Sequence, residues 1–146
     1  MLDGIKVVEI ANDISGAFAG KLFATYGAEV ILIETNFGDK IGNTPDQKNY
    51  ELNAEILRAY LHSGKKSISI DLELNTELEL LKQIILDSDV LIESCTPGKL
   101  SSNGIDFSEL INIKTQLVIC SITPYGQYGR HAHWTATSLT AAASGG

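Results

Sequence analysis

The stretch EIANDISGAFAG, from Glu9 to Gly20, passes from an apolar run through a short polar turn into small residues at helical spacing. A helix that begins near Ser15 and Gly16 would point free backbone N–H groups, and the positive end of its dipole, toward the end of the preceding strand. Helix starts of this kind bind anions. These residue types therefore indicate a site for an anionic ligand above the first strand.

The glycine spacing in this stretch bears on the class of ligand. Gly16 and Gly20 are separated by three residues, so the G-x-G-x-x-G pattern of dinucleotide-binding proteins is absent. Glu34 ends the second apolar run about where a ribose-binding acid would lie, but a solvated acid at a strand end is the better interpretation. The two glycines could equally allow a helix to pack closely on a sheet. A dinucleotide oxidoreductase is therefore the least favoured function.

Five short apolar runs rich in Val and Ile are predicted to be the strands that position this turn. They span residues 5–10, 28–34, 66–71, 89–94 and 117–122. Helical patterns follow at 16–26, 53–62, 76–88 and from Asp106 onward. Strands that alternate with helices form right-handed crossovers. We therefore expect one α/β domain over residues 1–146, with an open, doubly wound, mostly parallel, Rossmann-like sheet in three layers.

Local signals refine two of these helices. In the helix predicted at 76–88, Leu78, Leu81 and Ile85 fall on one face, and Thr76 with Glu79 has the spacing of a capping box. Asp106 is placed to cap the last helix. Two turn-rich segments, 35–52 and 123–134, each follow a predicted strand. Ligands of open α/β sheets bind at the carboxyl ends of strands, so both segments are candidate ligand loops.

Composition limits the partners of the chain. It has 146 residues and a net charge of −7, and it lacks the clustered basic face that nucleic acid requires. No apolar run has the length of a membrane span or a signal peptide, so we expect a cytoplasmic protein. Cys95 and Cys120 end apolar runs and are expected to be reduced and buried. His131 and His133 lack further ligands at suitable spacing, so no metal is expected.

Five segments together resemble the amino-terminal half of family III CoA transferases. They are LDGIKVVEI, SGAFAGKLFATYGAEVILIE, GKKSISIDL, DVLIESCTPGKL and LVICSITPYGQYG. Their order and spacing match this family, also called CaiB/BaiF, which includes formyl-CoA transferase, carnitine CoA transferase and α-methylacyl-CoA racemase. The resemblance implies that a Rossmann-like half holds an acyl-CoA, with coenzyme A as substrate rather than resident cofactor.

The resemblance also implies where the ligand lies. The turn from Asn12 to Gly16 matches the loop under the CoA thioester, and other matched segments supply the remaining contacts. The implied CoA-binding residues are Asn12, Ile14, Ser15, Gly16, Thr35, Lys65, Thr96, Pro97, Gly98, Lys99 and Thr123. Thr35 and Thr96 stand where family members usually have basic residues, which removes charge-assisted hydrogen bonds to phosphate. Compensating cations could come from Lys40, Lys65, Lys66, Lys99 or Arg130.

The resemblance places no catalytic residue in this chain. The transferase branch uses an aspartate that attacks the acyl-CoA carbonyl, expected beyond the matched segment. The racemase branch uses a His and an acid, which match Thr137 and Ser138 here, and neutral hydroxyls are poor bases near pH 7. Small apolar residues at helical spacing near the carboxyl end are expected to face a partner absent from this chain. Family members pair as interlocked dimers.

Two functions of different classes remain open at this point. The first is the acyl-CoA-binding half of a transferase that moves CoA between carboxylic acids, inactive by itself because the nucleophile is missing; a racemase fragment is a variant of it. The second is a non-catalytic, degenerate module for ligand binding or assembly. The second is favoured by Thr35, Thr96, Thr137 and Ser138, which stand where charged or catalytic groups are expected.

Overall fold

The computed structural model describes residues 1–36 and 50–145. Five strands form one parallel sheet in the order β3-β2-β1-β4-β5. The strands are β1 (Lys6–Ile10), β2 (Glu29–Thr35), β3 (Lys66–Ile70), β4 (Val90–Glu93) and β5 (Val118–Ser121). Each lies within one residue of a run predicted from the sequence, and the expected doubly wound α/β sheet is confirmed.

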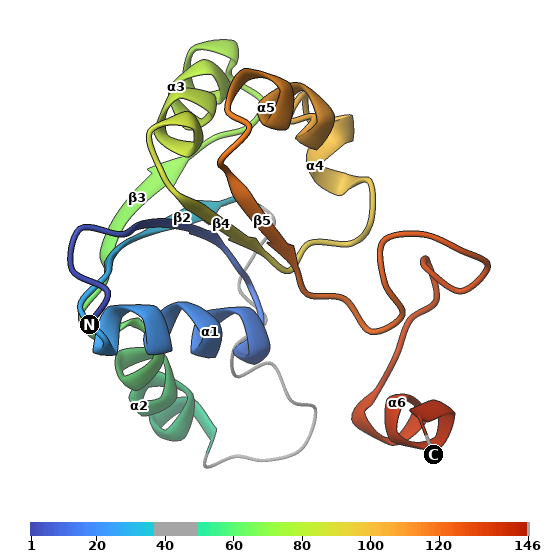
Figure 1. The fold of residues 1–146 in the computed structure, drawn as a ribbon. Coiled ribbons are helices and arrows are strands. Elements are labelled where there is room, and N and C mark those ends of the chain that lie inside the picture. The colour runs from blue at the N-terminus through green and yellow to red at the C-terminus, as the bar shows by residue number, and fades with distance from the viewer. Residues whose placement is uncertain (37–49, 146) are drawn as a thin grey trace.

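Helices cover both faces of this sheet (Figure 1). One face carries α1 (Ile14–Thr25) and α2 (Tyr50–His62), and the other carries α3 (Asn75–Leu86), α4 (Lys99–Ser102) and α5 (Phe107–Ile113). The last helix, α6 (Ser138–Gly145), follows an extended segment that leaves the sheet. Within residues 1–36 and 50–145, no helix has the length and apolar character needed to cross a membrane.

Both faces of the central strand are buried, because successive side chains of a strand point to opposite sides. Val8 and Ile10 of β1 join the core under α3, where Leu81 and Ile85 are fully buried as the helical pattern predicted. Val7 lies in the smaller cluster on the α1 face. Glu9 shares the α1 face with Val7. The alternation therefore places a carboxylate in the interior.

The helix starts differ from the predicted ones. Asp13 caps α1, with its Oδ1 accepting from the Gly16 N–H at 2.9 Å, so the helix begins two residues before the predicted start at Gly16. The predicted capping box is wrong, because α3 begins at Asn75 after Leu74, which makes no side-chain cap hydrogen bond. The Asp106 cap is confirmed by a 2.8 Å hydrogen bond from Ser108 N. The short helix α4 was not predicted.

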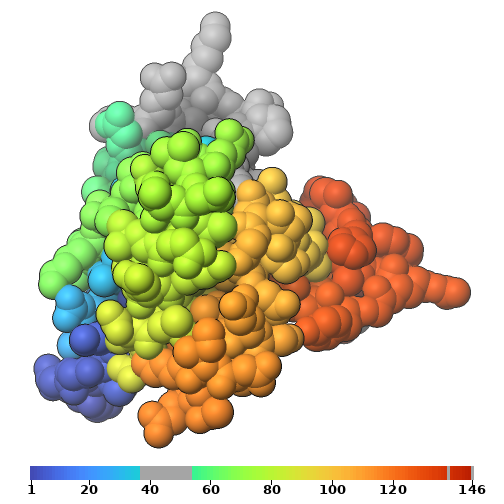
Figure 2. Space-filling model, turned by 90° about the horizontal axis from the view of Figure 1, so that it is seen from above, coloured from blue at the N-terminus to red at the C-terminus, as the bar shows by residue number. Residues whose placement is uncertain are grey.

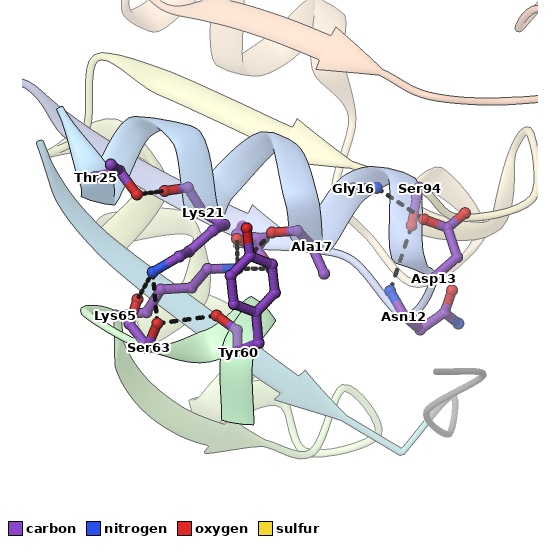
Figure 3. Close-up of polar contacts among 11 residues, drawn as sticks. Asn12, Asp13, Gly16, Ala17, Lys21, Thr25, Tyr60, Ser63, Lys65 and Ser94 are labelled. Atoms are coloured by element: carbon purple, nitrogen blue, oxygen red, sulfur yellow. Dashed lines mark hydrogen bonds and ion pairs between the residues drawn. The ribbon is translucent and has the colours of Figure 1, made fainter. Parts of the chain in front are cut away.

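A buried ion pair fastens α1 to the sheet (Figure 3). Lys65 Nζ lies 2.6 Å from Glu9 Oε2 and 2.8 Å from Oε1, and it also donates to the Ala17 carbonyl at 2.8 Å. The three acceptors use all three ammonium protons. The side chains of Lys65 and Glu9 are 1% and 0% exposed. The pair therefore joins β1, α1 and the turn before β3.

Burial disfavours the charged form of both partners. It raises the pKa of Glu9 from 4.5 to about 7, against the opposing effect of the Lys65 ammonium. Burial also lowers the pKa of Lys65, again opposed by its partner. Each charge is thus tolerated in the interior only because the other is present, which is the usual condition for buried ion pairs.

Gly20 is required by this ion pair, because a side chain there would enter its space. A Cβ on Gly20 would lie 1.7 Å from Glu9 Oε2 and 2.7 Å from Cδ. We expect Gly20→Ala to lower the free energy of unfolding by about 1 to 3 kcal/mol, the usual cost of overpacking a core. Urea denaturation measures this. Gly145→Ala is the control, since a Cβ at that position would meet no heavy atom within 4 Å. Equal urea midpoints for the two variants would contradict the packing argument.

Lys65→Met tests the pair directly, because it leaves Glu9 buried without its cation. We expect the free energy of unfolding at neutral pH to fall by about 3 to 5 kcal/mol, as when one partner of a buried pair is removed. The double variant Glu9→Gln/Lys65→Met, which buries no charge, should recover a large part of that loss. A double variant less stable than Lys65→Met would show that the pair does not carry the energy assigned to it. Chemical denaturation of all three proteins provides the values.

Candidate functional site

The carboxyl edge of the sheet carries a cavity of about 390 Å³. The strand order reverses between β1 and β4, and the cavity lies beside that point, at the end of β4. Open α/β sheets bind ligands at this switch point. Glu93 at the end of β4 lines the cavity together with the turn at Thr96–Gly98, the α4–α5 region and residues of the segment after β5.

The two walls of this cavity come from distant parts of the sequence. One wall is the turn after β4, where Gly98 adopts a left-handed backbone with φ 79° and leads into α4. The other wall includes Gln127, Tyr128 and His133. In Figure 2 the carboxyl-terminal segment stands beside the atoms of α4 and projects from the body of the molecule. The cavity therefore lies between a packed wall and a projecting one.

The start of α1 lies at the same edge of the sheet. Asn12 N donates to Ser94 Oγ at 3.3 Å, which joins the strand ends of β1 and β4 (Figure 3). Asn12 Oδ1 is buried and has no hydrogen-bond partner among the described residues. A Cβ on Gly16 would lie 2.5 Å from Ala11 Cβ, so this glycine is needed for close packing of the helix start. Ile14 and Ser15 are exposed.

Glu93 is a buried acid that the sequence analysis missed. Its side chain is 1% exposed, Oε2 accepts from Cys95 N at 2.8 Å, and Oε1 accepts from Gln127 Nε2 at 2.8 Å. Burial raises the pKa of Glu93, the Ser121 hydroxyl and the Cys95 amide oppose that rise, and Asp13 adds to it. An acid within the apolar run VLIES was the available signal, as Glu9 was within VVEI.

The structure gathers only some of the predicted ligand residues at this edge. Thr96, Pro97 and Gly98 line the cavity, and Lys99 follows as the first residue of α4. Thr123 follows β5, and its buried Oγ1 has no hydrogen-bond partner among the described residues. Thr35 ends β2 opposite Ile70.

Other predicted residues lie away from the cavity. Lys65 is not at the edge, because the ion pair with Glu9 holds its ammonium under α1. Thr137 is exposed and forms hydrogen bonds with Thr140 at the start of α6, where Ser138 is the first helical residue. Lys66 pairs with Glu29 at 2.6 Å on the surface. Lys40, and most of the predicted loop 35–52, lie outside the described residues.

His131 and Cys95 pack against neighbouring residues, whereas Cys120 is exposed. His131 stacks on Trp134 with ring centroids 4.0 Å apart, and the edge of Tyr125 meets both rings. Among residues 1–36 and 50–145, no three His, Cys, Asp or Glu side chains come together as metal ligands would. Cys95 is buried as expected, but the expectation for Cys120 was wrong, because it lies exposed on the edge strand β5.

Comparison with known proteins identifies the family. The model of the family described as CoA-transferase family III matches residues 2–146. This chain belongs to CoA-transferase family III. The resemblance stated from the sequence is thereby confirmed, and the cavity is the carboxyl-edge crevice of a family III chain.

Similar sequences and structures carry names from the same family. The chain is 32% identical to the succinyl-CoA:(R)-benzylsuccinate CoA-transferase subunit BbsE of Thauera aromatica over 97% of its length, and 33% identical to a succinate–glutarate CoA-transferase of Agrobacterium fabrum over 90%. A crystal structure of a CaiB/BaiF family protein from Brucella suis covers 94% of the chain with 33% identity and a TM-score of 0.76. The family III chain spans 35%, 34% and 37% of these three proteins, respectively.

Proposed function

We propose that this chain is the acyl-CoA-binding part of a family III CoA transferase, an enzyme that moves CoA between carboxylic acids. The observation that carries the proposal is the cavity at the carboxyl edge, bounded by the turn at 96–98, in a chain of this family. A ligand of nucleotide size is extended, so it would use the cavity together with the neighbouring start of α1. The two relatives described above, from Thauera aromatica and Agrobacterium fabrum, are both CoA-transferases by name.

The polar groups at the edge suit the pantetheine and phosphate parts of CoA. Asn12 Oδ1 is a buried acceptor, and the amide N–H groups of pantetheine are donors that would satisfy it. Thr123 Oγ1 offers a second buried polar atom past the end of β5, on the far side of β4 from β1. The N-terminus of α1 favours negative charge, although the Asp13 carboxylate already uses the Gly16 N–H there. Lys99 is the nearest cation in sequence to the cavity turn.

Catalysis requires a nucleophile that these residues do not supply. In the transferase mechanism an enzyme carboxylate attacks the acyl-CoA carbonyl and displaces the CoA thiolate, giving a mixed anhydride. The thiolate then attacks the enzyme-derived carbonyl of the anhydride, which gives an enzyme thioester and releases the donor carboxylate. We propose that this carboxylate comes from the part of the relatives' length that this chain does not span. Thr137 precedes α6 and Ser138 is its first residue, and neither is assigned a catalytic role.

We also propose that the chain assembles with a second copy or with the remainder of a longer chain. One face of α1 leaves Ile14, Phe18, Leu22 and Tyr26 between 42% and 51% exposed at four-residue spacing, and Leu139 of α6 is 79% exposed. Contiguous exposed apolar surface of this kind marks interaction sites. Sedimentation velocity measures the state of the chain, and a monomer at micromolar concentration would contradict self-association.

Calorimetric titration with CoA tests the proposed function. We expect saturable binding with a dissociation constant below about 1 mM, corresponding to more than roughly 4 kcal/mol. The titration is repeated on a protein that also contains the part of the relatives' length that this chain does not span. If CoA still does not bind, the result favours the alternative, a degenerate module without a CoA site. Titration with NADH in parallel should give no saturable signal, since the dinucleotide glycine pattern is absent.

Restoring a cation at Thr96 should strengthen CoA binding. Thr96 lines the cavity where family members usually carry an arginine. A charge-assisted hydrogen bond contributes about 1.5 to 3 kcal/mol, so we expect Thr96→Arg to tighten CoA binding about tenfold, with a smaller gain at high salt. Thr115→Arg adds the same charge in the exposed turn before β5 at the opposite edge and serves as the control. Equal affinities for the two variants would show that CoA phosphate does not reach Thr96.

A further inference from the structure

The two walls of the cavity are joined by one carboxylate. Glu93 ends β4, and its Oε2 accepts from Cys95 N at 2.8 Å, where the chain turns toward Thr96–Gly98. Its Oε1 accepts from Gln127 Nε2 at 2.8 Å, in the wall that follows β5. Cys95 and Gln127 are distant in sequence and approach the acid from different segments. The Glu93 side chain therefore links the two walls directly.

Among the described residues, the segment from Thr123 to Trp134 makes several contacts within itself. Its backbone hydrogen bonds, from Ala132 to Gly129 and from Trp134 to His131, are internal. Its aromatic contacts join Tyr125, His131 and Trp134 to one another. The bond from Gln127 to Glu93 ties this segment to the end of β4 and so to the sheet. Loss of that bond would remove this link between the segment after β5 and the end of β4.

The surroundings of Glu93 are arranged to keep its two oxygens as acceptors. The side chain is 1% exposed, and the donors around it are the Cys95 amide, the Gln127 amide and the Ser121 hydroxyl. The charged group that acts on it is Asp13, the cap of α1, which disfavours ionisation. Buried networks of satisfied hydrogen bonds fix the positions of the groups that they join. The Glu93 carboxylate therefore fixes the positions of its donors, although Asp13 disfavours its charge.

We propose that Glu93 is a positioning residue, which fixes the cavity turn and the segment after β5 at the separation that CoA binding requires. This inference rests on the proposed function only for the identity of the ligand, CoA. Glu93 acts through Cys95 and Gln127, and it takes no part in bond making. The conformational order of the segment after β5, which Glu93 maintains, is a property of the chain without ligand, and it can be measured separately from CoA binding.

Glu93→Gln tests the inference, because an amide has one acceptor oxygen and its NH₂ would face a donor that now bonds the carboxylate. We expect hydrogen exchange in residues 125–133 to accelerate about tenfold and CoA binding to weaken about tenfold, the effect of losing one hydrogen bond to a charged group. Exchange in β1 and α3 should not change. The exposed acid of α3 provides the control, Glu79→Gln, which should leave both readouts as in the wild type.

The reciprocal variant E93Q/Q127E should restore the hydrogen bond between positions 93 and 127. The amide at position 93 would then donate to a carboxylate at position 127 and accept from Cys95 N, so exchange in 125–133 should return to within about threefold of the wild type. If Glu93→Gln does not fold, Gln127→Ala removes the same bond from the outer side and should give the same acceleration. Unchanged exchange in every variant that folds would overturn the positioning role. Wild-type protein that fails to bind CoA would overturn the proposed function instead.

Discussion

The ion pair between Glu9 and Lys65 is the interaction on which the arrangement of this domain depends. It places two charges between the central strand and α1, and it adds the Ala17 carbonyl as a third partner. Because a buried charge without its partner is strongly destabilising, α1 has one position in which all three groups are satisfied. Gly20 supplies the room for the carboxylate. The start of α1 is therefore aimed at the carboxyl edge by polar geometry as well as by apolar packing.

A second buried acid extends the same principle to the cavity. Glu93 pairs in register with Ile10, one position beyond the pairing of Glu9 with Ile92. The pleat then turns the two acids to opposite faces, Glu9 toward α1 and Glu93 toward the side where α4 and α5 form one wall. One acid fixes the helix that begins at the edge, and the other joins the two walls beside it. The adjacent ends of β1 and β4 thus organise both halves of the candidate site.

Much of the fold follows from the sequence because it rests on local patterns. Apolar runs rich in Val and Ile predicted all five strands, and the stripe of Leu81 and Ile85 predicted the buried face of α3. The helix starts were harder to predict because they depend on which residue occupies the N-cap position. Asp13 caps α1 through its side chain, whereas Leu74 precedes α3 without a side-chain cap. The family resemblance, rather than a local pattern, pointed to Thr96–Gly98, which the structure places in the lining of the cavity.

The buried polar network was beyond such reasoning because it is set by distant partners. Lys65 is 56 positions from Glu9, and nothing in GKKS distinguishes it from Lys66, which lies on the surface. The structure reverses the expectation for Lys65 by burying the cation that was expected to be available to phosphate. The partnership of Glu93 with Gln127 spans 34 positions and depends equally on the sheet order. Chemistry that is assembled across strands becomes visible only when the strands are in place.

The most direct test of the central claim, that CoA binds at the carboxyl edge of this sheet, is a titration of the ¹⁵N-labelled chain with CoA followed by NMR. The account predicts amide shifts concentrated in residues 12–16, 95–98 and 123–128. Shifts centred on the opposite edge of the sheet, around the smaller cavity that Lys6, Glu29 and Asp87 line, would contradict it. So would an unchanged spectrum at millimolar CoA.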